Sequence, residues 1–233
     1  MDRPDNQLYI REIEVKNLVV STNVNLCNYG TMRDACNNFS YTFNCGKAYA
    51  FIGECGAGGW ALSYTLAGRE KDIIEGSIKI NDKYADSKML SRYSCYIGEG
   101  VIEEKRIVGY QTPIIRQIKN GVKLNKEKFK NANEVIKLFG LENEREALRK
   151  NIYKVGDLRW LASIAIGYSY AKRIYCFPWL NSERAKFVKN QLYNAFDILK
   201  NDGAIIVFPT IKLDTIKDII DEVIYFKYSF EKM

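Results

Sequence analysis

A run of glycines between an apolar segment and a helical segment decides the fold: Gly53-Glu54-Cys55-Gly56-Ala57-Gly58-Gly59-Trp60. Residues 48–52 before it are short and apolar, which indicates a buried strand, and residues 60–67 after it have helical spacing. Glycine turns the backbone tightly without steric cost. The sequence therefore predicts strand, glycine-rich loop and helix, with the N–H groups of residues 56–60 gathered where a helix N-terminus can bind an anion.

The spacing of this loop is that of a P-loop, G-x-x-x-x-G-K-[ST], which lies between a strand and a helix. Gly53 and Gly58 hold its two glycine positions, with Gly56 between them. Gly59 stands where the lysine belongs, and Trp60 stands at the Ser or Thr position. A glycine loop of this kind is also compatible with a plain strand-to-helix turn, so the flanking segments decide between the two interpretations.

Those flanking segments resemble the start of an ATP-binding subunit of an ABC transporter. Tyr29 falls where that family has an aromatic side chain that stacks on adenine, although a packing role for Tyr29 is an equal alternative. The turn at residues 44–47, the Leu-Ala-Gly at 66–68 and the G-x-I-x-I-N run at 76–81 match segments of the same family. The resemblance continues to the C-terminus and covers essentially the whole chain.

The later motif positions of that family are present, but their side chains are replaced. At the LSGGQ position, residues 153–157, only Gly156 is kept, followed by Asp157. Acids such as Asp157 and Glu99 are more often solvated surface residues than functional groups, and Gly156 is compatible with a simple turn glycine. The other replacements are Glu99 for the glutamine of the Q-loop, Pro178 and Trp179 for the Asp and catalytic Glu of the Walker B strand, and Thr210 for the histidine of the switch strand.

The resemblance implies which chemistry these replacements remove. ATP hydrolysis depends on positioning and charge neutralisation: a lysine and Mg²⁺ neutralise the phosphates, a hydroxyl and an Asp hold the metal, and a Glu and a His act on the attacking water and the γ-phosphate. Such groups act as a unit, so five losses together are hard to compensate. We therefore expect no catalytic residue, no metal site, no bound Mg²⁺ and no required cofactor, with at most weak ATP or ADP binding. Trp60 is expected to fill the vacated phosphate or metal space, or to pack on Trp179 or Phe177.

The composition agrees with an ordinary globular chain. It has 233 residues, 47% of them hydrophobic, which suits a single domain spanning residues 1–233. Six cysteines without a C-x-x-C pair and the absence of histidine argue against a zinc or redox site, so we expect reduced, mostly buried thiols. The net charge of +7 permits nucleic-acid contact, but the basic residues are spread out, so no nucleic-acid partner is expected.

The expected architecture is an α/β, ABC ATPase-like P-loop core: a mixed, mostly parallel sheet with flanking helices. An N-terminal antiparallel β region and a helical subdomain inserted at residues 99–161 complete it. The expected strands are 9–20, 39–43, 48–52, 76–81, 93–97, 173–177, 204–208 and 223–226. The expected helices are 60–67, 161–170 and 183–199, with a charged helical stretch over 103–150.

The resemblance implies a partner-dependent function. We expect a non-hydrolysing subunit that supports an ABC permease, a second ATP-binding subunit or both, as a homo- or heterodimer. No window of about 18 apolar residues is present, so the expected location is cytoplasmic, at the inner face of the membrane through the permease. The first alternative is an interaction or regulatory protein outside transport that reuses the fold. The second is an active ATPase with atypical residues.

Overall fold

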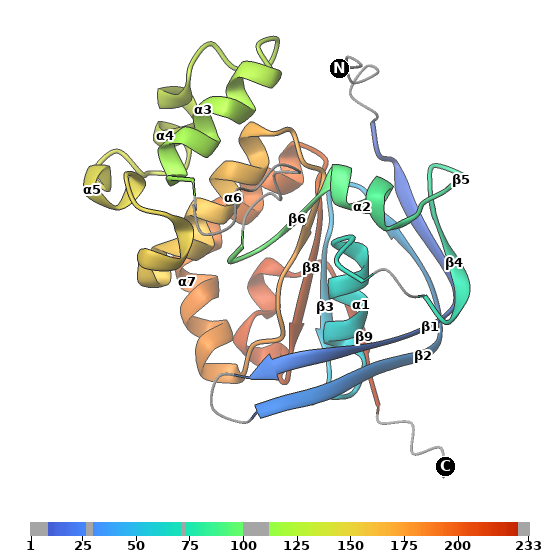
Figure 1. Ribbon diagram of the computed structural model, residues 1–233. Helices are drawn as coiled ribbons and strands as arrows, with labels where there is room; N and C mark the ends of the chain where they lie inside the picture. Colours follow the sequence, from blue (N-terminus) through green and yellow to red (C-terminus); the bar gives the residue numbers. More distant parts are fainter. Residues whose placement is uncertain (1–8, 27–29, 71–72, 100–111, 228–233) are drawn as a thin grey trace.

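The computed structural model describes residues 9–26, 30–70, 73–99 and 112–227 (Figure 1). Its first half contains a long hairpin followed by the strand, loop and helix that the sequence predicts. The elements are β1 (Glu12–Leu26), β2 (Gly30–Asn44), β3 (Ala48–Ile52), α1 (Gly59–Leu66), β4 (Glu75–Ile80), β5 (Lys83–Tyr84), α2 (Ser87–Tyr93) and β6 (Ser94–Tyr96).

The second half is mainly helical until two further strands return to the sheet. Its elements are α3 (Ile114–Leu124), α4 (Ala132–Leu138), α5 (Arg145–Leu148), α6 (Arg159–Ser169), β7 (Ile174–Cys176), α7 (Ser182–Asn201), β8 (Ile205–Thr210) and β9 (Glu222–Tyr225), with short 3-10 turns between some of them. Residues 103–111 of the expected charged helical stretch lie outside the described residues.

The strands form two sheets within the described part of the chain. One has four antiparallel strands in the order β2-β1-β4-β5, and the other has five parallel strands in the order β6-β7-β8-β3-β9. The expected α/β class, with an N-terminal antiparallel region, is confirmed. The antiparallel strands form a sheet of their own beside the parallel one, with α1 between the two (Figure 1).

The parallel sheet is buried on both faces, which explains why its strands read as continuous apolar runs. Along β3, Ala48, Ala50 and Ile52 pack toward α6 and α7 in one core cluster. Tyr49 and Phe51 point the other way, into a second cluster with α1 and the antiparallel sheet. Because successive side chains of a strand alternate between faces, one apolar strand can serve both cores.

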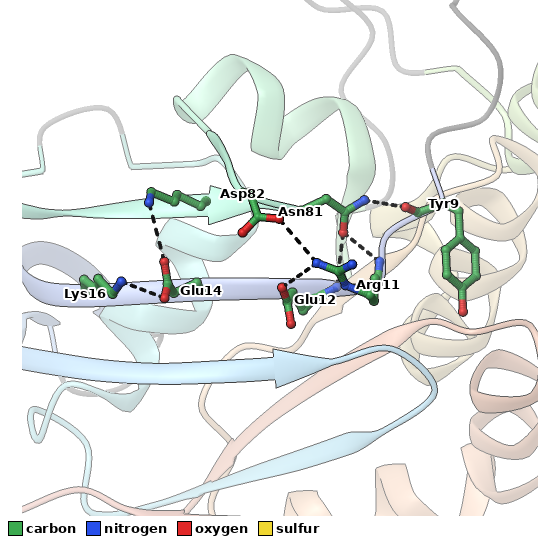
Figure 2. Close-up of polar contacts among 8 residues, drawn as sticks. Tyr9, Arg11, Glu12, Glu14, Lys16, Asn81 and Asp82 are labelled. Carbon is green, nitrogen blue, oxygen red and sulfur yellow. Dashed lines mark hydrogen bonds and ion pairs between the residues drawn. The ribbon is translucent and has the colours of Figure 1, made fainter.

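The turn after β4 holds the beginning of β1 in place (Figure 2). Asn81, with φ of +47°, accepts hydrogen bonds from the backbone N–H groups of Arg11 at 2.8 Å and Glu12 at 3.2 Å, and its amide donates to the carbonyl of Tyr9. The Arg11 guanidinium also reaches the carboxylates of Glu12 and Asp82. Exposed ion pairs contribute little, so the bonds of Asn81 fix this strand end.

The helices α3, α4 and α5 lie together at one end of the molecule, beyond α6 (Figure 1). Apolar side chains from all three join the core cluster on the α6 face of the parallel sheet. No helix among the described residues is long and apolar enough to cross a membrane.

A buried lysine joins α2 to the parallel sheet. Lys172, 7% exposed, donates from Nζ to the carbonyls of Ser91 at 2.9 Å and Arg92 at 2.6 Å, at the end of α2. Burial lowers the pKa of Lys172 to about 8, with Arg69 and Arg92 acting in the same direction and Cys95 opposing them. The neutral amine still has two N–H groups, which suffice for the two carbonyls.

The lowered pKa predicts how stability depends on pH. Between about pH 8, where folded Lys172 loses its proton, and about pH 10.4, where the unfolded side chain does, the unfolded chain binds more protons, so the free energy of unfolding rises with pH. Lys172→Met removes this contribution. Urea unfolding at both ends of the window should show wild type gaining roughly 2–3 kcal/mol relative to Lys172→Met. Lys88→Met, on the exposed side of α2, should keep the wild-type rise; its loss in that variant would contradict the assignment.

Candidate functional site

The glycine loop connects the carboxyl end of β3 to α1. Gly56 and Gly58 have φ of +98° and +105°, a region that glycine adopts readily. Gly58 is the N-cap residue of α1 and provides no side-chain cap. The loop is also bonded to β8, the strand beside β3 in the parallel sheet, because the Gly53 N–H donates to the carbonyl of Thr210 at 3.0 Å.

The N–H groups at the start of α1 are satisfied by a carboxylate from the hairpin. Asp34, on β2, is fully buried and accepts from the Gly58 N–H at 3.0 Å through Oδ1 and from the Ala61 N–H at 2.6 Å through Oδ2. Burial raises the pKa of Asp34, and the N–H groups of Ala61, Gly58, Gly56 and Trp60 act in the opposite direction. Of the N–H groups that the sequence predicts to gather at residues 56–60, that of Gly58 binds this carboxylate, together with the N–H of Ala61 one residue beyond. A side chain of this chain therefore lies at the N-terminus of α1.

Strand β2 lies directly on the loop. A Cβ at Gly58 would come within 2.5 Å of the Ala35 carbonyl oxygen and 2.9 Å of Cys36 Cα. Only glycine permits this approach, both for its φ and for the space. The charge of Asp34 is also felt by the neighbouring thiols: burial, followed by Asp34, raises the pKa of Cys36 to about 12 and that of Cys55 to about 11.

The positions of the P-loop lysine and hydroxyl contact other parts of the chain. A side chain at Gly59 would meet Phe51 Cβ at 3.4 Å, with Phe226 and Pro209 at 3.8 Å. Trp60 is partly buried, and its Nε1 donates to the hydroxyl of Tyr96 at 2.7 Å. The hydrogen-bond partner of Trp60 is thus Tyr96, on β6.

The Walker B and switch positions lie at the carboxyl ends of the parallel strands, next to the loop. Pro178 and Trp179 follow β7, and the Trp179 Nε1 donates to the carbonyl of Gly53 at 3.0 Å. Thr210, at the end of β8, is fully buried and donates its hydroxyl to the carbonyl of Leu180 at 2.7 Å. The structure therefore brings the loop, Trp179 and Thr210 together, as the motif order predicts.

The remaining motif positions have partners elsewhere. Glu99 pairs with Arg69 at 3.2 Å, and Asp157 pairs with Arg184 at 2.5 Å. Gly156 has φ of +55° and open space around it, as a turn glycine does. Tyr29 lies outside the described residues.

None of the five cysteines in the described ranges is in a disulfide; Cys27 lies outside those ranges. Cys36, Cys95 and Cys176 are buried, while Cys45 and Cys55 are partly exposed. The described residues also contain no group of three or more His, Cys, Asp or Glu side chains placed to hold a metal ion.

Sequence reasoning missed Asp34. It occupies no motif position, and it lies in a part of β2, before residue 39, where no strand was expected. The only signal was indirect: a cradle predicted at residues 56–60 requires an acceptor, and an acidic residue on a neighbouring strand can supply it.

Comparison with known proteins defines the class of fold. No family model matches this chain, and no curated protein matches it. Solved structures do match. One is cbiO1 from Clostridium perfringens, part of the ABC transporter complex cbiONQ: TM-score 0.63, 16% identity, over 94% of this chain and 85% of that one. A second is the ATP-binding cassette MJ0796, a dimer in a post-hydrolysis state bound to ADP and Pi: TM-score 0.63, 16% identity, 92% and 94% coverage.

A third match is a putative ABC-transporter ATP-binding protein from Pyrococcus furiosus, with TM-score 0.59, 18% identity and 92% and 97% coverage. These likenesses run through nearly the full length of both chains, and at this identity they show the fold. The chain has the fold of an ABC-transporter ATP-binding subunit.

The residues of this chain do not fit the Mg-ATP that such a fold implies. The phosphate cradle already holds the Asp34 carboxylate. The lysine position is a glycine whose Cβ would face aromatic side chains, and the two metal-ligand positions are Trp60 and Pro178. A triphosphate placed here would meet a negative charge where the fold normally supplies positive charge.

The bond between Trp60 and Tyr96 predicts a measurable coupling. Trp60→Phe leaves the Tyr96 hydroxyl, in a residue 5% exposed, without this donor and should lower the free energy of unfolding by about 1–3 kcal/mol. Tyr96→Phe added to Trp60→Phe should cost little more, since both polar partners are then gone. Urea unfolding of the four proteins gives the coupling energy. Additive effects would show that the bond contributes nothing to stability.

Proposed function

We propose that this chain is a non-hydrolysing subunit of ABC ATPase fold that supports a transporter through its contacts. The single observation that carries the proposal is that three positions where the fold normally acts on ATP, those of Gly59, Trp179 and Thr210, now bond to or face the chain itself. Trp179 donates to the Gly53 carbonyl, Thr210 donates to the Leu180 carbonyl, and the Gly59 position faces apolar side chains. None of these groups can neutralise phosphate charge, bind Mg²⁺ or polarise water.

The fold and its neighbours support a partner in general terms. One neighbour is part of a transporter complex, and another is dimeric. For this chain we propose an ABC permease, a second ATP-binding subunit or both, with the protein held at the inner face of the membrane by the permease.

We propose residues 99–161 as the helical subdomain that meets the permease. Within it, Leu124, Leu138 and Tyr153 are exposed apolar side chains, at 66%, 43% and 47%. An interaction or regulatory role outside transport remains the second candidate, because an inactive fold needs only a binding surface.

Loss of the catalytic groups predicts that the purified protein releases phosphate from ATP no faster than buffer, with or without Mg²⁺. The measurement is steady-state phosphate release at millimolar ATP, with an intact ABC ATPase as the positive control. A Mg²⁺-dependent rate of about one per second, which is within the ordinary range of enzymes, would overturn the proposal if it disappears in Gly58→Ala.

The partner is tested by affinity purification from detergent-solubilised native membranes. Wild type should recover a membrane permease, and Leu138→Asp or Tyr153→Asp should lose it, because a charge at an apolar contact must be desolvated. Ile74→Asp is the matched control: Ile74 is 60% exposed and lies outside the proposed subdomain, just before β4, so recovery should persist. Recovery of a soluble protein and no permease would favour the second candidate instead.

A further inference from the structure

The cradle of the glycine loop has a ligand, and that ligand comes from another sheet. The two oxygens of Asp34 divide the available donors: Oδ1 takes the Gly58 N–H at 3.0 Å and Oδ2 takes the Ala61 N–H at 2.6 Å. The side chain is fully buried, so these donors replace its water. A carboxylate held by several backbone N–H groups at a helix N-terminus is bound as an external anion would be.

We propose that Asp34 is a built-in anionic ligand of the glycine loop, which holds the loop in its anion-bound form without nucleotide and excludes phosphate from it. The proposal rests on the proposed function, since it explains how a chain that does not use ATP keeps a loop shaped to bind it. Asp34 then takes the place of the phosphate group in the cradle.

The packing of β2 against the loop keeps the Asp34 side chain in the cradle. The Ala35 carbonyl and Cys36 Cα lie against Gly58 so closely that even a methyl group would not fit there. A rotation of the Asp34 side chain alone would leave this backbone against the loop and would not open the loop to solvent. The strand itself must move, and it is paired with β1 along most of its length.

Charge explains why the lysine and metal ligands are dispensable once Asp34 is present. A single carboxylate can be stabilised by backbone N–H groups alone. A triphosphate carries more negative charge, and its hydrolysis needs a lysine and Mg²⁺ in addition. The glycine at position 59 and the acid at position 34 are thus complementary: the loop holds a ligand of lower charge and lacks the cation that hydrolysis of a triphosphate uses.

An ordinary helix cap is the simpler interpretation, and Asp86 shows what that looks like in the same chain. Asp86 is the N-cap residue of α2, is exposed, and accepts from Met89 N, three residues away, at 2.7 Å. Asp34 reaches donors 24 and 27 residues away and is fully buried. The two aspartates therefore form a matched pair for an experiment.

The experiment compares Asp34→Ala and Asp86→Ala with wild type by thermal unfolding, with and without millimolar pyrophosphate. Asp34→Ala should lower Tm by about 5–10 °C, because buried N–H groups lose their acceptor. Pyrophosphate should restore at least half of that loss, since it can enter the vacated cradle. Asp86→Ala should lower Tm by less and gain nothing from pyrophosphate, and wild type should gain nothing either. An Asp34→Ala protein that folds and is not rescued would overturn the proposal.

A second measurement covers the case in which Asp34→Ala does not fold. In wild type, the amide resonances of Gly58 and Ala61 should not move when pyrophosphate is added, and in Asp34→Asn they should shift upfield as the charged acceptor is lost. Movement of the wild-type resonances with pyrophosphate, or unchanged positions in Asp34→Asn, would overturn the proposal. If one of these two contradicting results is obtained and wild type shows no ATP turnover, the role of Asp34 is overturned and the proposed function stands. ATP turnover by wild type would contradict the proposed function itself.

Discussion

The bonds between the Asp34 carboxylate and the amides of the glycine loop join the two sheets of this protein. The acid comes from the antiparallel sheet, the loop comes from the parallel one, and α1 lies between them. A buried carboxylate without donors would cost several kcal/mol, and so would buried N–H groups without an acceptor. The carboxylate of Asp34 therefore supplies the acceptor that the N–H groups require, and these N–H groups supply the donors that the carboxylate requires. Glycine is required at position 58 because β2 approaches that residue so closely.

The same logic extends to the ends of the parallel strands. In an α/β fold these ends form the crevice where ligands bind. Here the crevice residues bond to one another: the Trp179 indole to the loop, the Thr210 hydroxyl to the segment after β7, and the Trp60 indole to Tyr96. Side chains that would face a substrate in an open site contribute instead to internal hydrogen bonding and packing. The polar groups at these strand ends are therefore turned inward, toward the chain's own backbone and side chains.

Much of this fold could be predicted from the sequence, because its signals are local. The limits of β3 were predicted to the residue and those of α1 to within one, since an apolar run followed by glycines and helical spacing is unambiguous. The length of the hairpin was underestimated: residues 21–26 and 30–38 are largely polar, and cross-strand pairing, which no short window reveals, makes them strands. The helix α2 was also missed, although Asp86 before it is a recognisable cap.

The candidate site was predictable only in part, for a related reason. Motif order placed Trp179 and Thr210 beside the loop, because sequence spacing in a known topology carries that information. It could not supply Asp34 or Tyr96, whose roles depend on contacts with residues 24 and 36 positions away. The contacts that each replaced side chain makes depend on tertiary packing, and tertiary packing depends on both residues of a contact, not on one sequence position alone.

Two indoles, Trp60 and Trp179, hydrogen-bond at the loop, while the third, Trp160, is buried beneath Gly98 with the Arg159 guanidinium over its ring. Two of the three tryptophans of this protein therefore report directly on the state of the glycine loop. Opening of the crevice would release both N–H groups to water and shift the emission spectrum without any label. The chain thus contains its own optical probe of the contacts around the glycine loop.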